Sequence, residues 1–354
     1  MAGFEALVRE GARLRADTHA PRDEDAPYAV LFTSGSTGAP KGAIRTYRSF
    51  HAVIASYALG HSPRHLSFQP LSHLSERMYL PALLAHGGCV GFSEGAAHLF
   101  EELRALEPTT IGAVPRVYEV LQSQHARRLR EALAAQPARP RADVEAEVLR
   151  ETGRSLGGRV MALSAGSAPV PPALVEFLRR AFPDVWVSDG YGSTEVGTIA
   201  YDGRIAAHVD VKLAPRPEVV PVDAQGPERG EILVRSPHRI AGYLGDPVAT
   251  AAAIDADGYF ATGDLGERTP DGGVRVLGRL RNVVKLAQGE FLSVERVETA
   301  LAATPVVDRV FVHVGHGAST FAALVLPDAA VLARMLATTE TSRASLVARD
   351  DAPG

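Results

Sequence analysis

One stretch of the chain combines the residue types needed to hold a polyphosphate. Residues 32–42 read Phe-Thr-Ser-Gly-Ser-Thr-Gly-Ala-Pro-Lys-Gly. Glycines let a backbone turn tightly and approach an anion closely, and successive N–H groups near the start of a helix favour negative charge. Hydroxyl groups add hydrogen-bond donors, and a lysine adds a mobile positive charge. The residues expected to grip phosphate are Thr33, Ser34, Gly35, Ser36, Thr37, Gly38 and Lys41.

The spacing within this loop argues against a P-loop NTPase. Counting from Gly35, the position where that motif requires a second glycine is Pro40, and Gly42 follows the lysine where Ser or Thr is needed. A flexible Gly/Ser linker is the plainer alternative. Linkers rarely carry a fixed Pro-Lys-Gly between a predicted strand at 28–33 and a predicted helix from 42 to about 59, so phosphate binding is favoured.

The loop resembles the signature phosphate loop of the adenylate-forming superfamily, which comprises acyl-CoA synthetases, peptide-synthetase adenylation domains and luciferases. Two weaker matches follow in the expected order. Residues 70–73 (Pro-Leu-Ser-His) resemble the motif that borders the acyl pocket, although a lone histidine is usually structural. Residues 164–169 resemble the strand end along adenine and the acyl pocket, or form an ordinary turn. The resemblance places His73 at the border of the acyl pocket. It places Gly166, Ser167 and Ala168 along adenine and the acyl pocket.

Residues 189–195 (Asp-Gly-Tyr-Gly-Ser-Thr-Glu) give a stronger match to the same superfamily. The resemblance implies that Tyr191 stacks against adenine and that Thr194 contacts phosphate. It also implies that Glu195 helps to hold Mg²⁺, a hard cation that takes carboxylate and phosphate oxygens. Asp189 is expected to accept a hydrogen bond from the adenine amino group. The nucleotide-contacting segment is Asp189, Gly190, Tyr191, Gly192, Ser193 and Thr194.

Two further motifs complete the expected nucleotide site. Residues 259–264 (Tyr-Phe-Ala-Thr-Gly-Asp) resemble the segment whose aspartate binds both ribose hydroxyls, and a carboxylate can accept two hydrogen bonds side by side. The resemblance therefore assigns Asp264 to ribose, and Arg279 to ribose and phosphate. Each motif alone could be a plain turn or a surface pair, but their shared order along the chain favours the assignment.

Residues 284–293 (Val-Lys-Leu-Ala-Gln-Gly-Glu-Phe-Leu-Ser) indicate the branch of the superfamily. They resemble the adenylation domain of carboxylic acid reductases, with long-chain fatty acyl-CoA synthetases close behind, and differ from peptide-synthetase domains. The resemblance adds Lys285 to the catalytic and nucleotide-contacting residues, beside Lys41, His73, Thr194 and Glu195. A hinge is expected near Arg281, so that a small domain can rotate and bring 288–290 to the site.

The elements that must position these residues read as an α/β fold. Strand-like runs at 66–69, 89–92, 110–114, 159–164 and 185–188 alternate with helix-like stretches, which predicts a layered core with a mainly parallel sheet. Long helices are expected at 116–135 and 143–151. After about residue 202 the strands look antiparallel, so a small β-rich subdomain and a partial α+β C-terminal domain are expected.

Three segments are predicted: a partial AMP-binding adenylation domain over 1–278, a partial C-terminal subdomain over 279–338, and a disordered tail over 339–354. Superfamily members carry a longer region before the phosphate loop. They also carry a terminal lysine in a later segment, whereas the last lysine of this chain is Lys285. Truncation is therefore expected, with slow adenylation and an exposed apolar face where the missing subdomain would pack.

The expected function is ATP-dependent activation of a carboxylic acid, fatty or aryl, as an acyl-adenylate, followed by transfer to the thiol of CoA or phosphopantetheine. Two alternatives stay open: a catalytically silent nucleotide-binding remnant, and a half-enzyme that needs a partner chain or carrier protein. The resemblance implies ATP and Mg²⁺ as cofactors and a small carboxylic acid as substrate.

Composition narrows the partners and the compartment. The net charge of −4 comes from interspersed signs, so a nucleic-acid partner is not expected. No apolar stretch approaches about 20 residues, so no membrane span is expected. The single cysteine, Cys89, fits a reducing cytoplasm and is expected to be a small core residue rather than a nucleophile.

Overall fold

The structure is a computed structural model that describes residues 23–33, 39–57, 62–219, 226–304, 306–315, 317–329, 331–333 and 335–337. Two sets of sequence predictions lie outside these ranges. One is the centre of the phosphate loop, from Ser34 to Gly38, and the other is the tail 339–354.

A mixed sheet of five strands, in the order β5-β6-β7-β8-β9, carries most of the parallel pairing. The first three strands run parallel because helices connect them, and the last two continue antiparallel. A separate parallel pair is formed by β3 (Arg64–Ser67) and β4 (Cys89–Phe92). The five strands are β5 (Thr110–Ala113), β6 (Ala162–Gly166), β7 (Trp186–Ser193), β8 (Gly197–Tyr201) and β9 (Arg204–Ile205).

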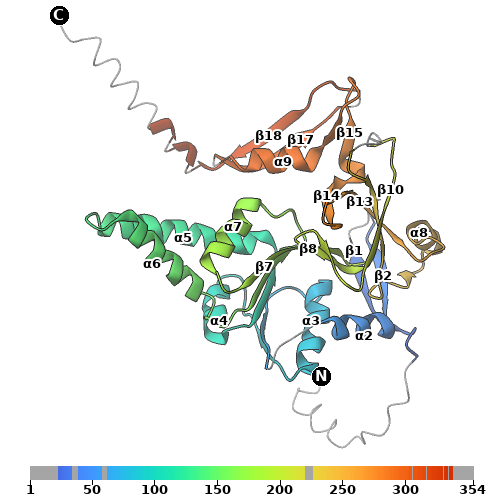
Figure 1. Ribbon diagram of the computed structural model, residues 1–354, viewed down its shortest axis with the longest axis horizontal. Coiled ribbons are helices and arrows are strands. Elements are labelled where there is room, and N and C mark those ends of the chain that lie inside the picture. Colours follow the sequence, from blue (N-terminus) through green and yellow to red (C-terminus); the bar gives the residue numbers. More distant parts are fainter. Residues whose placement is uncertain are drawn as a thin grey trace, which may run out of the picture.

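Amphipathic helices cover these strands. In α7, Leu174, Phe177 and Leu178 recur at helical spacing, are buried and pack in one core with Leu163 of β6. Burying a leucine in this way contributes about 1.5–3 kcal/mol. The helices of this part are α3 (Leu74–Ala85), α4 (Leu99–Leu106), α5 (Pro115–Ala135), α6 (Arg141–Arg154) and α7 (Pro172–Ala181). Figure 1 shows α5, α6 and α7 side by side at one end of the molecule.

The segment after the phosphate loop corrects a prediction. The sequence predicts a helix directly after Gly42, but β2 (Lys41–Thr46) forms there and pairs antiparallel with β1 (Pro27–Thr33). The long-range ladder outweighs local propensity, because β2 also pairs on its other side with β12 (Gly242–Tyr243). The loop therefore leads from strand to strand, and the proposed contribution of a helix start to phosphate binding has no support.

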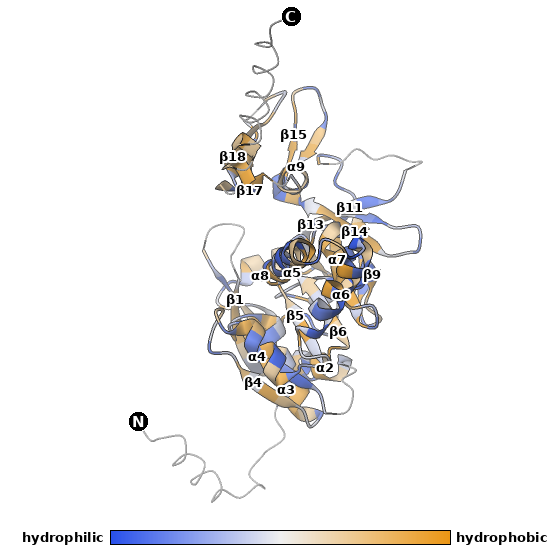
Figure 2. Ribbon diagram, turned by 90° about the vertical axis from the view of Figure 1, so that its left-hand side faces the viewer, coloured by the Kyte–Doolittle hydropathy of each residue, from blue (hydrophilic) through white to orange (hydrophobic). Residues whose placement is uncertain are grey.

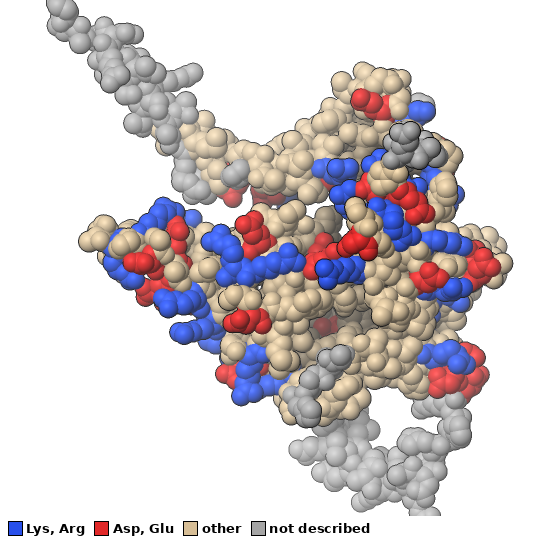
Figure 3. All heavy atoms as spheres, viewed as in Figure 1, with Lys and Arg blue, Asp and Glu red and all other residues tan. Residues whose placement is uncertain are grey.

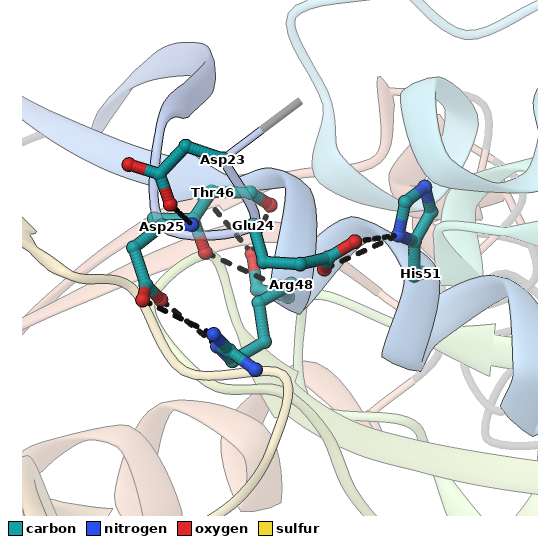
Figure 4. Close-up of polar contacts among 7 residues, drawn as sticks. Asp23, Glu24, Asp25, Thr46, Arg48 and His51 are labelled. Atoms are coloured by element: carbon teal, nitrogen blue, oxygen red, sulfur yellow. Dashed lines mark hydrogen bonds and ion pairs between the residues drawn. The ribbon is translucent and has the colours of Figure 1, made fainter. Parts of the chain in front are cut away.

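The helix α2 (Tyr47–Ser56) begins only after β2 because Thr46 caps it. The Thr46 hydroxyl accepts from the Ser49 amide, and the Ser49 hydroxyl accepts from the Thr46 amide, which satisfies two otherwise free donors. Figure 4 shows how this helix start is tied to the preceding segment: the Arg48 guanidinium lies 2.8 Å from the Asp25 carboxylate. His51 approaches Glu24 at 3.0 Å in the same view.

A second sheet, entirely antiparallel, follows in the order β10-β11-β13-β14 and confirms the predicted change of character after residue 202. Its strands are β10 (Asp210–Ala214), β11 (Arg229–Arg235), β13 (Phe260–Arg268) and β14 (Val274–Arg279), and α8 (Pro247–Ala253) lies beside it. A second apolar core joins this sheet to β8 and β2 through Ile232, Val234, Ile199 and Ala43.

The C-terminal elements gather at the opposite end from α2 and α3, as Figures 1 and 2 both show. The 3₁₀ turn η2 (Leu280–Asn282) leads into β15 (Val283–Lys285), which pairs with β16 (Phe291–Ser293). The helix α9 (Val294–Ala302) then packs beside β17 (Val307–His313), which pairs with β18 (Ala322–Pro327). The hinge expected near Arg281 falls in η2 and stays a prediction.

The structure tests three predictions from the sequence. The prediction of a mainly parallel sheet is wrong for the described residues, where three strand pairs are parallel and the others are antiparallel. Cys89 is exposed rather than buried, because β4 has only one neighbouring strand. None of the described helices combines the length and apolar composition that a bilayer crossing requires.

Over α5 and α6, basic and acidic side chains are interspersed, as Figure 3 shows.

Candidate active site

Three predicted site residues meet where the two sheets adjoin. Asp264 and Arg279 are paired across β13 and β14, and the Arg279 Nε lies 3.0 Å from the Asp264 Oδ1. Tyr191, on β7, donates its hydroxyl to the Asp264 Oδ2 at 2.7 Å. Asp264 is buried, whereas Arg279 is about half exposed. The carboxylate is therefore held rigidly from two sides, with an accessible guanidinium next to it.

Burial and charge act in opposite directions on this trio, which we call the Tyr–Asp–Arg trio. Burial raises the pKa of Asp264, while the Arg279 charge and the Tyr191 hydrogen bond lower it. Burial, followed by the Asp264 charge, raises the pKa of Tyr191 well above its ordinary value, so that its phenol stays protonated. An ionised carboxylate offers about four acceptor positions. Two positions remain for hydroxyl donors such as a diol.

A second group forms around Tyr243 on β12. The Lys41 Nζ lies 5.2 Å from the centroid of the Tyr243 ring, a cation–π arrangement. The Tyr243 hydroxyl donates to the Glu195 carboxylate at 3.3 Å. Burial, and then the Glu195 charge, raises the pKa of Tyr243. The two groups are electrostatically connected, because the Glu195 charge also raises the pKa of Asp264.

Tyr243 was not among the residues predicted from the sequence. It sits in a two-residue strand, too short for a periodicity argument, and its contacts reach 48 residues back to Glu195. Its only local signal is the Gly-Tyr pair ahead of Asp246 and Pro247, which cap and begin α8.

A buried polar cluster lies behind this group. Arg45, on β2, donates to the carbonyl oxygens of Thr194 and His238. The His238 ring lies 4.1 Å, centroid to centroid, from the ring of His208. Both histidines have a buried Nε2 without a hydrogen-bond partner among the described residues. Burial, and next the neighbouring His208, lowers the pKa of His238 from 6.5 to about 4.

This cluster predicts acid sensitivity of the fold. Between pH 6.5 and 4 the unfolded chain protonates His238 while the folded chain does not, so stability is complete above that window and declines as the pH falls through it. Lowering the pH from 7 to 5 is expected to cost about 2 kcal/mol. Urea unfolding at both pH values measures this loss. A His238→Phe variant should lose less stability over the same interval, and an equal loss would contradict the assignment to His238.

The glycines of the predicted adenine-facing segments have a packing reason. Gly166 and Gly190 are partners across β6 and β7, and a Cβ on Gly166 would lie 2.7 Å from the Gly190 carbonyl oxygen. A Cβ on Gly192 would lie 2.4 Å from the Gly197 oxygen. Ser167 has a φ of +64° and, like Ala168, is exposed at the strand end. The result is a flat stretch of bare backbone that a planar ring could approach.

Asp189 lies at the same strand ends, beside a second acid. Partial burial, and then the Asp202 charge, raises the pKa of Asp189 to about 6. Its backbone amide donates to Asp202 Oδ1 at 2.9 Å, and Arg179 holds the other Asp202 oxygen at 3.1 Å. Asp189 therefore has its carboxylate free of protein partners in the described structure and can accept a hydrogen bond from a ligand.

The other predicted residues differ in how close they lie to the candidate site. Thr33 and Lys41 face each other at the base of the phosphate loop. His73 is exposed at the start of α3. Lys285 is exposed at the end of β15, 5.4 Å from the centroid of the Phe291 ring. In the described structure, no hydrogen bond or ion pair joins His73 or Lys285 to another predicted site residue.

The residues present fit a metal ion that is held mainly by its substrate. Within the described ranges, no group of three or more His, Cys, Asp or Glu side chains is arranged to hold a cation. Glu195 is half-buried and has one hydroxyl partner, Tyr243. Mg²⁺ commonly takes one or two carboxylates, with phosphate oxygens and waters as its other ligands. Glu195 is suited to be such a single protein ligand.

Comparison with known proteins gives one consistent result. Residues 3–244 match the family described as AMP-binding enzyme. The carboxylic acid reductase of Mycobacterium tuberculosis is 33% identical over 342 residues, which cover 93% of this chain and 29% of the reductase. Long-chain-fatty-acid–CoA ligase 1 of Cavia porcellus is 32% identical over 350 residues, with coverages of 88% and 50%.

A solved structure extends the likeness to three dimensions. The A domain of carboxylic acid reductase from Segniliparus rugosus, in complex with AMP and a co-purified carboxylic acid, superposes with a TM-score of 0.77 at 30% identity. The match covers 93% of this chain and 54% of that one. The chain thus spans about half the length of the ligase and of the A domain, and less of the whole reductase.

Proposed function

The chain belongs to the AMP-binding enzyme family, and we propose that it activates a carboxylic acid with ATP as an acyl-adenylate and passes the acyl group to a thiol. The proposal rests on the Tyr–Asp–Arg trio together with the group formed by Lys41, Tyr243 and Glu195, because the Glu195 charge acts on Asp264. One group suits a nucleoside and the other suits a polyphosphate.

In the first step, a carboxylate oxygen of the acid attacks the α-phosphorus of ATP, and the bond from that phosphorus to the bridging oxygen of pyrophosphate breaks. Such displacements depend on positioning and on electrostatic stabilisation. Asp264 would accept from the ribose hydroxyls, and Arg279 would contact the ribose and the α-phosphate. Lys41 would neutralise the charge that develops on the departing pyrophosphate.

In the second step, a thiolate attacks the acyl carbon, and AMP leaves with the electron pair of the acyl–oxygen bond. Glu195 would hold Mg²⁺, which neutralises phosphate charge when bound. A rotation at η2 would bring Lys285 and the following Gln288-Gly289-Glu290 toward the site. The proposed acceptor is CoA or a phosphopantetheine on a carrier protein. The A domain that holds AMP together with a co-purified carboxylic acid supports an acid as the co-substrate.

The purified chain is expected to incorporate labelled pyrophosphate into ATP in the presence of Mg²⁺ and a fatty or aryl acid, because acyl-adenylate formation is reversible. The incorporation should depend on the acid, which a panel of chain lengths and aromatic acids would show. Calorimetry with ATP and Mg²⁺ checks binding separately. No heat of binding under any condition would contradict the proposal.

A half-enzyme that needs a partner chain is the second candidate, favoured by large apolar side chains on the surface. Phe32 of β1, Leu84 of α3 and Phe92 of β4 expose 67%, 63% and 69% of their area, and where such side chains adjoin they can mark an interaction surface. Under this alternative the chain binds ATP but shows no exchange until a second polypeptide is added. ATP binding without exchange, with or without such a chain, would instead indicate a catalytically silent nucleotide-binding protein.

A further inference from the structure

Arg45 is the largest fully buried side chain among the described residues, with an exposed fraction of 0%. Burying a cation is costly unless hydrogen bonds satisfy it. Burial lowers the pKa of Arg45 to about 10, against the opposing effect of the Glu195 charge. The side chain therefore remains a cation at neutral pH, in the interior of the protein. Because burying this charge is costly, the contacts that Arg45 makes in the interior must offset the cost.

The hydrogen bonds of Arg45 go to main-chain oxygens rather than to an acid. One terminal nitrogen donates to the Thr194 carbonyl at 2.6 Å, and the other donates to the His238 carbonyl. No carboxylate of the described ranges forms an ion pair with it, and the charge that raises its pKa is that of Glu195, which acts through space. The guanidinium thus holds backbone in place with two nitrogens in a rigid fork.

The backbone that Arg45 holds is the turn 194–196, between β7 and β8. The Glu195 amide donates to the Ser193 hydroxyl at 3.2 Å, and the Glu195 carbonyl accepts from the Ile240 amide at 2.8 Å. Together with the Arg45 bond to Thr194, these contacts fix both peptide groups on either side of Glu195. Arg45 lies four residues after Lys41 on the same strand, so it joins the strand that carries the lysine to the turn that carries the carboxylate.

We propose that Arg45 is a positioning residue for the phosphate end of the site. It sets the orientation in which the Thr194 hydroxyl and the Glu195 carboxylate face the phosphates and the Mg²⁺ that they carry. Arg45 itself contacts neither substrate nor metal. The inference rests on the proposed function, and it predicts that loss of Arg45 affects metal-dependent binding much more than binding of the nucleoside part.

The test compares two affinities in an Arg45→Met variant, which keeps an unbranched apolar stem and removes the charge and the donors. The Mg²⁺ concentration that half-saturates ATP binding in calorimetry, and that half-saturates pyrophosphate exchange, is expected to rise about tenfold, as when partners that orient metal ligands are removed. The dissociation constant for AMP without Mg²⁺ is expected to stay within about twofold, since the trio is unchanged.

Two other variants complete the test. Arg48→Met is the matched control, because Arg48 lies three residues away, is exposed and pairs only with Asp25 in the described structure. It should leave both affinities unchanged. Arg45→Lys keeps the cation, but its single nitrogen replaces the two nitrogens of the guanidinium fork, so a smaller rise in the Mg²⁺ requirement is expected. This variant decides the question if Arg45→Met does not fold.

An unchanged Mg²⁺ requirement in the folded variants would overturn the inference. Equal losses of AMP and Mg²⁺-dependent binding would overturn it too, because they would indicate a purely structural role. If the unaltered chain shows no exchange, the proposed function fails on its own account. Arg45 is then judged by the Mg²⁺ dependence of ATP binding alone.

Discussion

Replacing Lys41 with methionine is expected to lower the rate of ATP–pyrophosphate exchange about 100-fold, the usual cost of removing one group that stabilises a developing charge. Lys41 is the lysine at the base of the phosphate loop, opposite Thr33, and its ammonium lies over the Tyr243 ring. Tyr243 in turn donates to Glu195. Methionine keeps the apolar stem over the ring, so the fold should be little affected. The measurement is the initial rate of exchange at saturating ATP, Mg²⁺ and acid.

Lys212 offers a closely matched control. Its ammonium lies 3.9 Å from the centroid of another tyrosine ring, that of Tyr259, and pairs with the exposed Asp255 at 2.9 Å. Lys212→Met therefore removes the same charge from the same kind of setting, away from the candidate site. Exchange should be unaltered. If both variants lost activity equally, or if Lys41→Met kept full activity, Lys41 would not be the residue that neutralises pyrophosphate.

Replacing Asp264 with asparagine is expected to weaken AMP binding about 10- to 100-fold. Hydrogen bonds to a charged group contribute about 1.5–3 kcal/mol each, and the amide offers fewer acceptor positions than the carboxylate. The change also leaves Arg279 without its ionic partner and Tyr191 with a weaker acceptor. Stability should fall little, because burial already raises the pKa of Asp264 and so works against its charge. Calorimetry with AMP measures the affinity, and thermal unfolding checks the fold.

The chain contains a second Tyr–Asp–Arg arrangement that serves as the control. Asp210 accepts from the Tyr259 hydroxyl at 2.5 Å and from Arg235 at 2.7 Å, but all of this lies on an exposed part of the surface. Asp210→Asn should leave the affinity for AMP unchanged. Equal weakening by both substitutions would show that the effect is not specific to the Asp264 carboxylate.

Much of the layered fold follows from the sequence because its signals are local. The strand at 89–92 was predicted with the bounds that the structure has, and the helix predicted at 116–135 begins only one residue earlier, at Pro115, because both patterns are local. The β2 segment was predicted as helix. One of its pairing partners, β1, lies just before it in the chain, but the other, β12, lies about two hundred residues away. A single sequence does not show such partners, and propensity gives way to them.

The residues of the candidate site also fall into those that the sequence could identify and those that it could not. Tyr191, Asp264 and Arg279 could be named from motifs, and the structure brings them within hydrogen-bond or ion-pair distance. Arg45 and Tyr243 could not be named, because their roles depend on contacts 149 and 48 residues away in the chain. The pKa shifts follow from burial, which depends on the assembled sheets and not on residue type.

Arg279 is the final residue of β14, directly before η2, and the first turn of α9 reaches back to it. The Glu295 carboxylate accepts from the Arg279 amide at 3.4 Å and from the Asn282 side chain, and its charge helps to raise the pKa of Asp264. A swing of the C-terminal elements would separate Glu295 from this strand end. The pKa of the Asp264 carboxyl would then be lower, so that α9 would act on the candidate site through charge alone, without touching Asp264.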